Sequence, residues 1–170
     1  MLKAAGIVLI LTGAVGFGRY LAVSLGRYVS QLIECREIFV QMDAGREYLR
    51  LPYAQLLKRT AKGKEKLFAE ILTEVADEME KNKEADAGML WKQAFCKRKR
   101  EILLGKEEQE ILLSLARSLL LETDHTQVAK IYFMQLEDTI KRAMEEKKEK
   151  QKLYGTVSIL FGLFLVIMLL

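Results

Sequence analysis

The stretch KLYGTVSILFGLFLVIMLL, residues 152–170, contains no charged side chain after its first lysine. An α-helix rises 1.5 Å per residue, so a helix over residues 153–170 would be about 27 Å long, close to the thickness of the hydrocarbon core of a bilayer. A helix buried in a globular core is rarely so uniformly apolar. The stretch therefore predicts a C-terminal transmembrane helix at residues 153–170.

A second apolar region occupies residues 1–26, where Arg19 interrupts an otherwise uncharged run that follows Lys3. The alternative interpretation is a cleaved signal peptide, with Ala22 and Ser24 at the cleavage site. The run is long for the core of a signal peptide, and Arg19 lies between that core and the small residues. We therefore favour an uncleaved N-terminal transmembrane helix, in which Arg19 extends toward the interface.

Small residues recur in both apolar regions. Ala14 and Gly18 stand four residues apart, and Gly155 and Gly162 stand seven apart. Such spacing places small residues on one helix face, where membrane helices approach closely. One interpretation is that glycine is simply common in membrane helices. The other is that the two anchors pair through these residues, with each other or with a partner.

Flanking charge predicts the orientation of the two spans. Basic residues border the central region on both sides, namely Arg27, Arg36, Lys147, Lys148, Lys150 and Lys152. Loops rich in Lys and Arg stay on the cytoplasmic side. We therefore expect a cell-membrane protein whose residues 27–152 form a cytoplasmic domain and whose two termini lie outside.

The central region, residues 27–152, shows helical rather than strand periodicity. One apolar helix face is formed by Phe68, Ile71, Leu72, Val75 and Met79. Pro52 suits the first turn of a short helix that ends near Thr60, and Asn82 suits a helix end.

Asp86 suits the N-cap of a helix that carries Trp91 and Phe95, which are expected in the core. The two outermost helices are expected to continue from the membrane into the domain. The last of them is predicted to carry an apolar face, namely Val128, Ile131, Tyr132, Leu136, Ile140 and Met144. The sequence predicts an all-α fold, a compact bundle of about six helices on N- and C-terminal transmembrane helices.

Motifs with known chemistry are missing from the sequence. It contains no phosphate-binding loop, no H-E-x-x-H and no paired C-x-x-C. Cys35 and Cys96 are too few for a disulfide scaffold, and His125 is the only histidine. We expect a non-enzymatic protein with no catalytic, cofactor-binding or metal-binding residues and no small-molecule substrate.

Four consecutive basic residues, Lys97, Arg98, Lys99 and Arg100, are the candidate partner-binding site. One interpretation is a solvated helix C-terminus, which the helix dipole favours. The other is a docking patch for an acidic partner or for anionic lipid head groups. Nucleic acid is not expected as a partner, because no aromatic stacking platform accompanies the cluster.

The layout as a whole resembles the stage III sporulation protein AB family. The resemblance rests on the start MLKAAG, the pair Gln31–Leu32, Tyr48 and Pro52 in YLRLP, Trp91 in MLWKQAF, and the lysine-rich segment before the C-terminal apolar run. Leu120 and Asp124 also match the family pattern, whereas Leu121 stands where the family tends to have glycine.

This resemblance implies a soluble domain similar to the helical F-domains of type II secretion platform proteins. It also implies a membrane component of the channel or secretion-like complex between mother cell and forespore. The implied partners are the ATPase of that complex, on the cytoplasmic side, and other stage III sporulation membrane proteins. The rival hypothesis is a membrane-tethered adaptor or regulator unrelated to sporulation.

Overall fold

The computed structural model describes residues 2–82, 85–120 and 126–169. Within its first and last helices, some side chains lie outside this description, namely those of residues 2–11, 14, 15, 21, 126, 154, 155, 158, 159, 162, 165, 166, 168 and 169. Leu121, Asp124 and His125 also lie outside the described residues, so the expectations for them are not tested.

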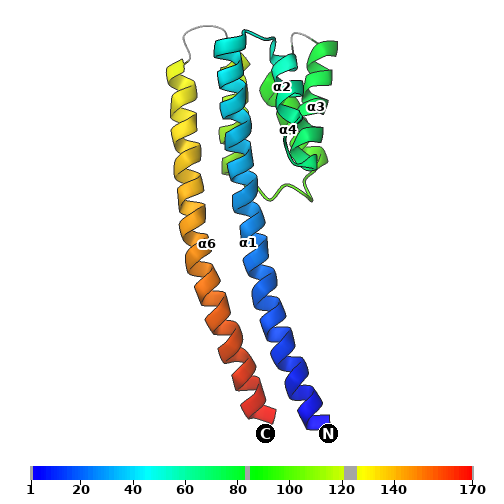
Figure 1. Cartoon of the computed structure of the whole chain (residues 1–170), viewed down its shortest axis with the longest axis vertical. Coiled ribbons are helices and arrows are strands. Elements are labelled where there is room, and N and C mark those ends of the chain that lie inside the picture. Colours follow the sequence, from blue (N-terminus) through cyan, green and yellow to red (C-terminus); the bar gives the residue numbers. More distant parts are fainter. Residues whose placement is uncertain (1, 83–84, 121–125, 170) are drawn as a thin grey trace. The chain divides into compact units, whose positions relative to one another are not determined.

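The described residues form six helices and no strand, which confirms the predicted all-α fold. In chain order these are α1 (Leu2–Leu49), α2 (Tyr53–Ala61), α3 (Lys66–Lys81), α4 (Ala87–Lys97), α5 (Lys106–Leu120) and α6 (Thr126–Leu169) (Figure 1). The two outer helices are continuous over their whole length, as the sequence predicted.

The chain divides into two compact units. Residues 1–29 and 141–170 form one, which we call the terminal unit, and Ser30–Ile140 form the other, which we call the bundle unit. α1 and α6 each contribute to both units, whereas α2 to α5 belong to the bundle unit alone.

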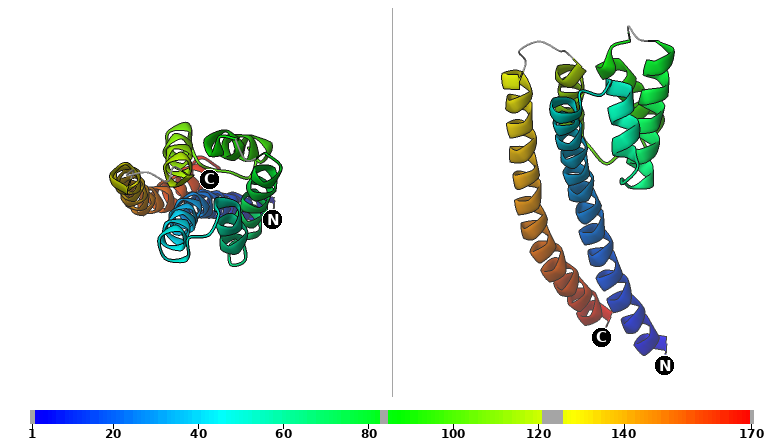
Figure 2. Two further views of the ribbon diagram at one scale, coloured as in Figure 1. Left: turned by 90° about the horizontal axis from the view of Figure 1, so that it is seen from above. Right: turned by 45° about the horizontal axis from the view of Figure 1, so that its top comes forward.

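Neighbouring helices of the bundle unit pack in chain order, α2 on α3, α3 on α4 and α4 on α5 (Figure 2). The core draws on every helix of the unit, since its most deeply buried side chains are Leu32, Ile38, Phe39, Met42, Leu57, Phe68, Ile71, Leu72, Trp91, Leu112, Leu115 and Leu136. The Trp91 ring stacks on Phe39 at 5.0 Å between centroids and meets the edge of Phe95 at 5.6 Å. The predicted apolar face of α3 and the core positions of Trp91 and Phe95 are confirmed.

Local signals fix most of the helix ends. Asp86 is the N-cap of α4, where its carboxylate accepts a hydrogen bond from the Gly88 N–H at 2.8 Å. Asn82 is the C-cap of α3. Pro52 is the N-cap of α2 rather than its first helical residue, so the helix begins one position later than predicted. α1 ends before Arg50, whose φ of 47° is a left-handed conformation that side-chain-bearing residues rarely adopt.

The inward face of α6 within the bundle unit differs from the predicted one. Val128 and Ile131 are exposed, at 39% and 54%, whereas Ala129 and Leu136 are buried. The prediction for Val128 and Ile131 is therefore wrong, as it is for Met144 further along α6, which is 44% exposed. A small residue, Ala129, faces the core, and Ile131 two positions later lies on the opposite side of the helix. Periodicity counted on large side chains alone overlooks Ala129.

The terminal unit consists of the first part of α1 and the last part of α6, which run antiparallel (Figures 1 and 2). Among the described residues, no stretch of helix combines the length and the apolar character needed to cross a membrane. The two predicted transmembrane helices are therefore not confirmed. Gly18 is buried, but the side-chain positions of Ala14, Gly155 and Gly162 lie outside the description, so their predicted packing is not tested.

Candidate partner-binding site

The four basic residues of the candidate site lie at the C-terminal end of α4. Lys97 is the last residue of that helix and Arg98 is its C-cap. The Arg98 carbonyl accepts hydrogen bonds from the backbone N–H groups of Glu101 and Ile102, at 2.9 and 3.1 Å. The chain thus leaves α4 through a hydrogen-bonded turn, and its positive charges lie where the partial negative charge of a helix end stabilises them.

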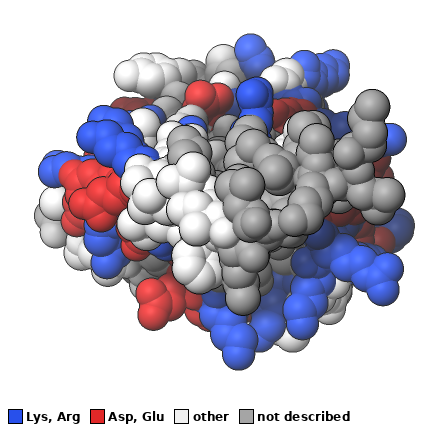
Figure 3. Space-filling model, turned by 90° about the horizontal axis from the view of Figure 1, so that it is seen from below, with Lys and Arg blue, Asp and Glu red and all other residues white. Residues whose placement is uncertain are grey.

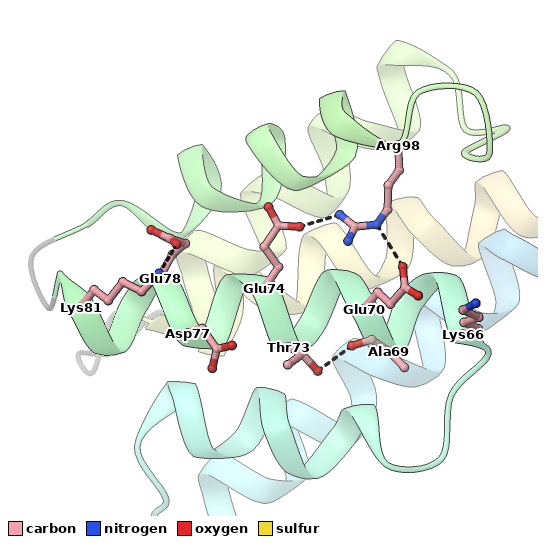
Figure 4. A pocket seen from close by; sticks show the side chains of 9 residues that line it. All are labelled: Lys66, Ala69, Glu70, Thr73, Glu74, Asp77, Glu78, Lys81 and Arg98. Atoms are coloured by element: carbon pink, nitrogen blue, oxygen red, sulfur yellow. Dashed lines mark hydrogen bonds and ion pairs between the residues drawn. The ribbon is translucent and has the colours of Figure 1, made fainter.

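Two of the four basic residues are bound to α3. Lys97 Nζ donates to one oxygen of Glu74 at 2.5 Å, and Arg98 Nη1 donates to the other at 2.6 Å. Arg98 Nε also lies 3.7 Å from a carboxylate oxygen of Glu70, so the guanidinium reaches across from α4 to α3 (Figure 4). Hydrogen bonds from Lys97 and Arg98 lower the pKa of Glu74, which keeps this carboxylate ionised.

Lys99 and Arg100 behave differently from this pair. Both side chains are exposed, and neither forms an ion pair or hydrogen bond with any residue that the structure describes. Lys92, on α4, is exposed in the same way. The structure therefore divides the predicted cluster into two anchoring cations, Lys97 and Arg98, and two cations available to a partner.

A buried amide holds the chain just beyond this turn. Gln31 on α1 is only 7% exposed. Its Nε2 donates to the Glu101 carbonyl and its Oε1 accepts from the Leu103 N–H, both at 2.8 Å. This pair of hydrogen bonds, which we call the Gln31 clamp, uses one side chain to satisfy a backbone donor and a backbone acceptor. Together with Glu74, it fixes both ends of the segment that presents Lys99 and Arg100.

A groove of about 510 Å³ runs along α3 beside Arg98. It is lined by Lys66, Ala69, Glu70, Thr73, Glu74, Asp77, Glu78, Lys81 and Arg98 (Figure 4). Its carboxylates are paired with cations, since Glu78 binds Lys81 at 2.7 Å and Asp77 binds Lys58 at 2.9 Å. No group of three or more potential metal ligands occurs among the described residues. The groove is a network of surface ion pairs.

Three further groups have a raised pKa because they are buried. Burial raises the pKa of the Cys35 thiol, which lies in the core, whereas Cys96 is exposed on α4. Burial also raises the pKa of Glu34, which accepts a hydrogen bond from the Glu65 N–H at 2.7 Å, at the start of α3. The Tyr53 hydroxyl donates to the Ala116 carbonyl at 3.3 Å, and burial raises its pKa.

Surface charge is mixed where it can be seen. On the face shown in Figure 3, basic side chains are interspersed with acidic ones. Nucleic-acid-binding surfaces have instead a continuous basic patch or stripe.

These features define an all-α helical-bundle protein. Its surface carries a turn after α4, residues 97–100, which is held by hydrogen bonds and which we call the basic turn. The chain belongs to the stage III sporulation protein AB family, which it matches over residues 3–170, and this confirms the resemblance drawn from the sequence. Membership gives the protein a role related to sporulation. No curated protein and no solved structure matches the chain, so the similarity of its soluble domain to type II secretion F-domains stays a prediction.

Proposed function

We propose that this protein is a non-enzymatic, membrane-anchored platform component of the sporulation complex between mother cell and forespore. Its bundle unit presents a binding surface to the cytoplasmic ATPase of that complex and to other stage III sporulation membrane proteins. One observation carries the proposal: Lys99 and Arg100 are exposed and form no ion pair among the described residues, while Glu74 and the Gln31 clamp hold the chain around them. Family membership favours this role over an adaptor unrelated to sporulation.

The anchoring in a membrane rests on the sequence. Residues 153–170 contain no charged side chain, and the side chains of several of these residues lie outside the description. Residues 4–18 are likewise uncharged. Insertion of both segments in the mother-cell membrane leaves residues 27–152 on the cytoplasmic side, because the flanking Lys and Arg residues stay there.

Fixed cations suit the recognition of an acidic partner. A flexible lysine loses side-chain entropy when it binds, and ordering its backbone adds to that cost. The turn between α4 and α5 is already held at Arg98, Glu101 and Leu103, so only the side chains of Lys99 and Arg100 need to be ordered. Complementary charge of this kind raises the rate of association and selects among partners.

The continuity of α1 and α6 supports a mechanical role. Each is one unbroken helix that contributes to both units of the chain. In the proposed function, an ATPase bound to the bundle unit acts on the membrane-embedded ends through these two helices.

The test is a pair of charge-reversal variants of the full-length protein, isolated from membranes of sporulating cells. Lys99→Glu with Arg100→Glu should abolish co-purification of the ATPase, identified by mass spectrometry. The matched control reverses two exposed cations that also form no ion pair among the described residues, Arg59 on α2 and Lys130 on α6. Unchanged recovery of the ATPase with the first variant would remove the basic turn from the proposed function.

A further inference from the structure

Charge is distributed unequally between the two units of the chain. The terminal unit holds nine Lys and Arg against three Asp and Glu, a net charge of +6, whereas the bundle unit holds 18 against 20, a net charge of −2. The three acidic residues of the terminal unit, Glu145, Glu146 and Glu149, all belong to α6. The α1 part of the unit, residues 2–29, carries no acidic residue, so no carboxylate of that part neutralises its cations.

A contact between α1 and α6 places several of these cations at one level. A Cβ atom on Gly26 would lie 3.8 Å from Lys147 Nζ and 3.9 Å from Lys147 Cε, so the lysine stem crosses onto α1 where α1 has no side chain. Arg27 and Lys148 are the next residues along the two helices. Cations of both helices therefore lie at about the same level along the terminal unit.

These cations have no acidic partner within the described residues. Arg27 and Lys148 are exposed, Lys147 is partly exposed, and none of the three forms an ion pair there. Lys150 differs, because its Nζ lies 2.8 Å from a carboxylate oxygen of Glu146. Three cations thus remain available to anions from outside the chain, and we call Arg27, Lys147 and Lys148 the basic collar.

The position of the basic collar along the helices fits the phosphate layer of a membrane. At a rise of 1.5 Å per residue, Lys147 lies about 9 Å along α6 from Leu153, where the uncharged C-terminal stretch begins. The polar head-group regions add about 10–15 Å in total to the hydrocarbon core, so phosphates lie within several ångströms of its edge. Long Lys and Arg side chains span the remaining distance.

We propose that the basic collar binds the phosphates of anionic phospholipid head groups. The proposal rests on the membrane anchoring of the proposed function and adds a lipid class to it. Charge complementarity supports the proposal, because a polybasic segment beside a membrane span attracts anionic lipids. Each Lys or Arg near the surface raises the affinity for an anionic membrane about fivefold. The acidic residues of the terminal unit leave it with a net charge of +6, and bound anionic lipid would offset part of that charge.

The experiment compares lipids at the surface of the intact protein. The full-length chain is reconstituted in vesicles of phosphatidylcholine and phosphatidylglycerol, and electron spin resonance of spin-labelled lipids measures which head group is retained at the protein. The test variant replaces Arg27, Lys147 and Lys148 by Gln. The matched control replaces Arg59, Lys62 and Lys130 of the bundle unit by Gln; all three are exposed and form no ion pair among the described residues, so the control removes the same number of charges.

The wild-type protein and the matched control should prefer phosphatidylglycerol by at least about fivefold, the value expected for a single Lys or Arg at the surface, and the test variant should lose most of this preference. Raising the salt concentration to 1 M should reduce the preference of the wild type, because the screening length falls to about 3 Å. Far-UV circular dichroism should show equal helix content in all three proteins.

Two kinds of failure are distinguishable. If no spin-labelled lipid of either class is immobilised, the protein is not in the membrane and the proposed function fails with the further inference. If lipid is immobilised without preference, or with equal preference in the test variant, the protein is inserted and only the basic-collar proposal is overturned. A third outcome concerns a protein partner. If the test variant keeps the lipid preference but loses an acidic protein that co-purifies with the wild type from cell membranes, the basic collar binds that protein and the proposal is overturned.

Discussion

Replacing Gln31 by Met tests whether the Gln31 clamp stabilises the bundle unit. Methionine keeps the unbranched shape and nearly the volume of glutamine but offers neither a strong donor nor a strong acceptor. The substitution therefore removes two hydrogen bonds of 2.8 Å and leaves the Glu101 carbonyl and the Leu103 N–H without the partner that they have now.

The expected loss follows from two contributions. Each lost hydrogen bond costs about 1 kcal/mol, and each partly buried backbone group left unsatisfied adds up to about 1 kcal/mol more when water reaches it incompletely. The free energy of unfolding should therefore fall by about 2–4 kcal/mol. The control is Gln93→Met on the exposed surface of α4, which should stay within about 0.5 kcal/mol of the wild type.

Chemical unfolding of the full-length protein in detergent micelles, followed by circular dichroism, measures this difference. A second measurement is local: amide exchange at Leu103 should accelerate, because its N–H loses its acceptor. Trypsin should also cleave after Lys99 and Arg100 faster in the variant. A Gln31→Met protein that matches the wild type in stability and in Leu103 exchange would refute the clamp as a stabilising contact.

Substitutions at four further positions test other contacts. Trp91→Ala should cost about 3–5 kcal/mol and Trp91→Phe clearly less, because phenylalanine keeps an aromatic ring against Phe39 and Phe95; chemical unfolding followed by circular dichroism distinguishes the two. Arg50→Gly should stabilise the protein by about 0.5–1 kcal/mol, since glycine adopts a φ of 47° without strain, and Arg50→Ala should bring no such gain in the same unfolding experiment. Asp86→Ala should cost about 1–2 kcal/mol through loss of the N-cap bond to Gly88; an unchanged melting temperature would contradict this. The pKa of Glu74 is lowered from 4.5 in the folded protein, so its contribution to stability is present above pH 4.5 and is lost as the pH falls through the folded pKa. The free energy of unfolding of Glu74→Gln should therefore be lower than that of the wild type at neutral pH and should converge with it in acid, as unfolding measured over a pH series will show.

Features encoded within a few residues of one another were predictable from the sequence. The apolar face of α3 repeats along a single helix, and the N-cap at Asp86 needs only a residue two positions later. The continuity of α1 and α6 was also predictable, because no breaker interrupts either segment in the sequence. In each case the physical cause lies within one or two helical turns.

Contacts between distant residues were not predictable in the same way. Gln31 and Leu103 are 72 positions apart, and the sequence offered Gln31 only as part of a family resemblance. Glu74 belongs to the polar face of α3, and its pairing with Lys97 and Arg98 depends on how α3 and α4 pack. The basic cluster therefore appeared uniform in the sequence, although packing gives its two halves different surroundings.

The two cysteines differ in their environments, and this difference gives access to the proposed docking surface without any mutation. Cys35 is buried with a raised pKa, so it forms little of the reactive thiolate, whereas Cys96 is exposed and directly precedes Lys97. A maleimide fluorophore should therefore label the native chain at Cys96 alone. Such a dye would report the arrival of a partner at the basic turn by a change in anisotropy.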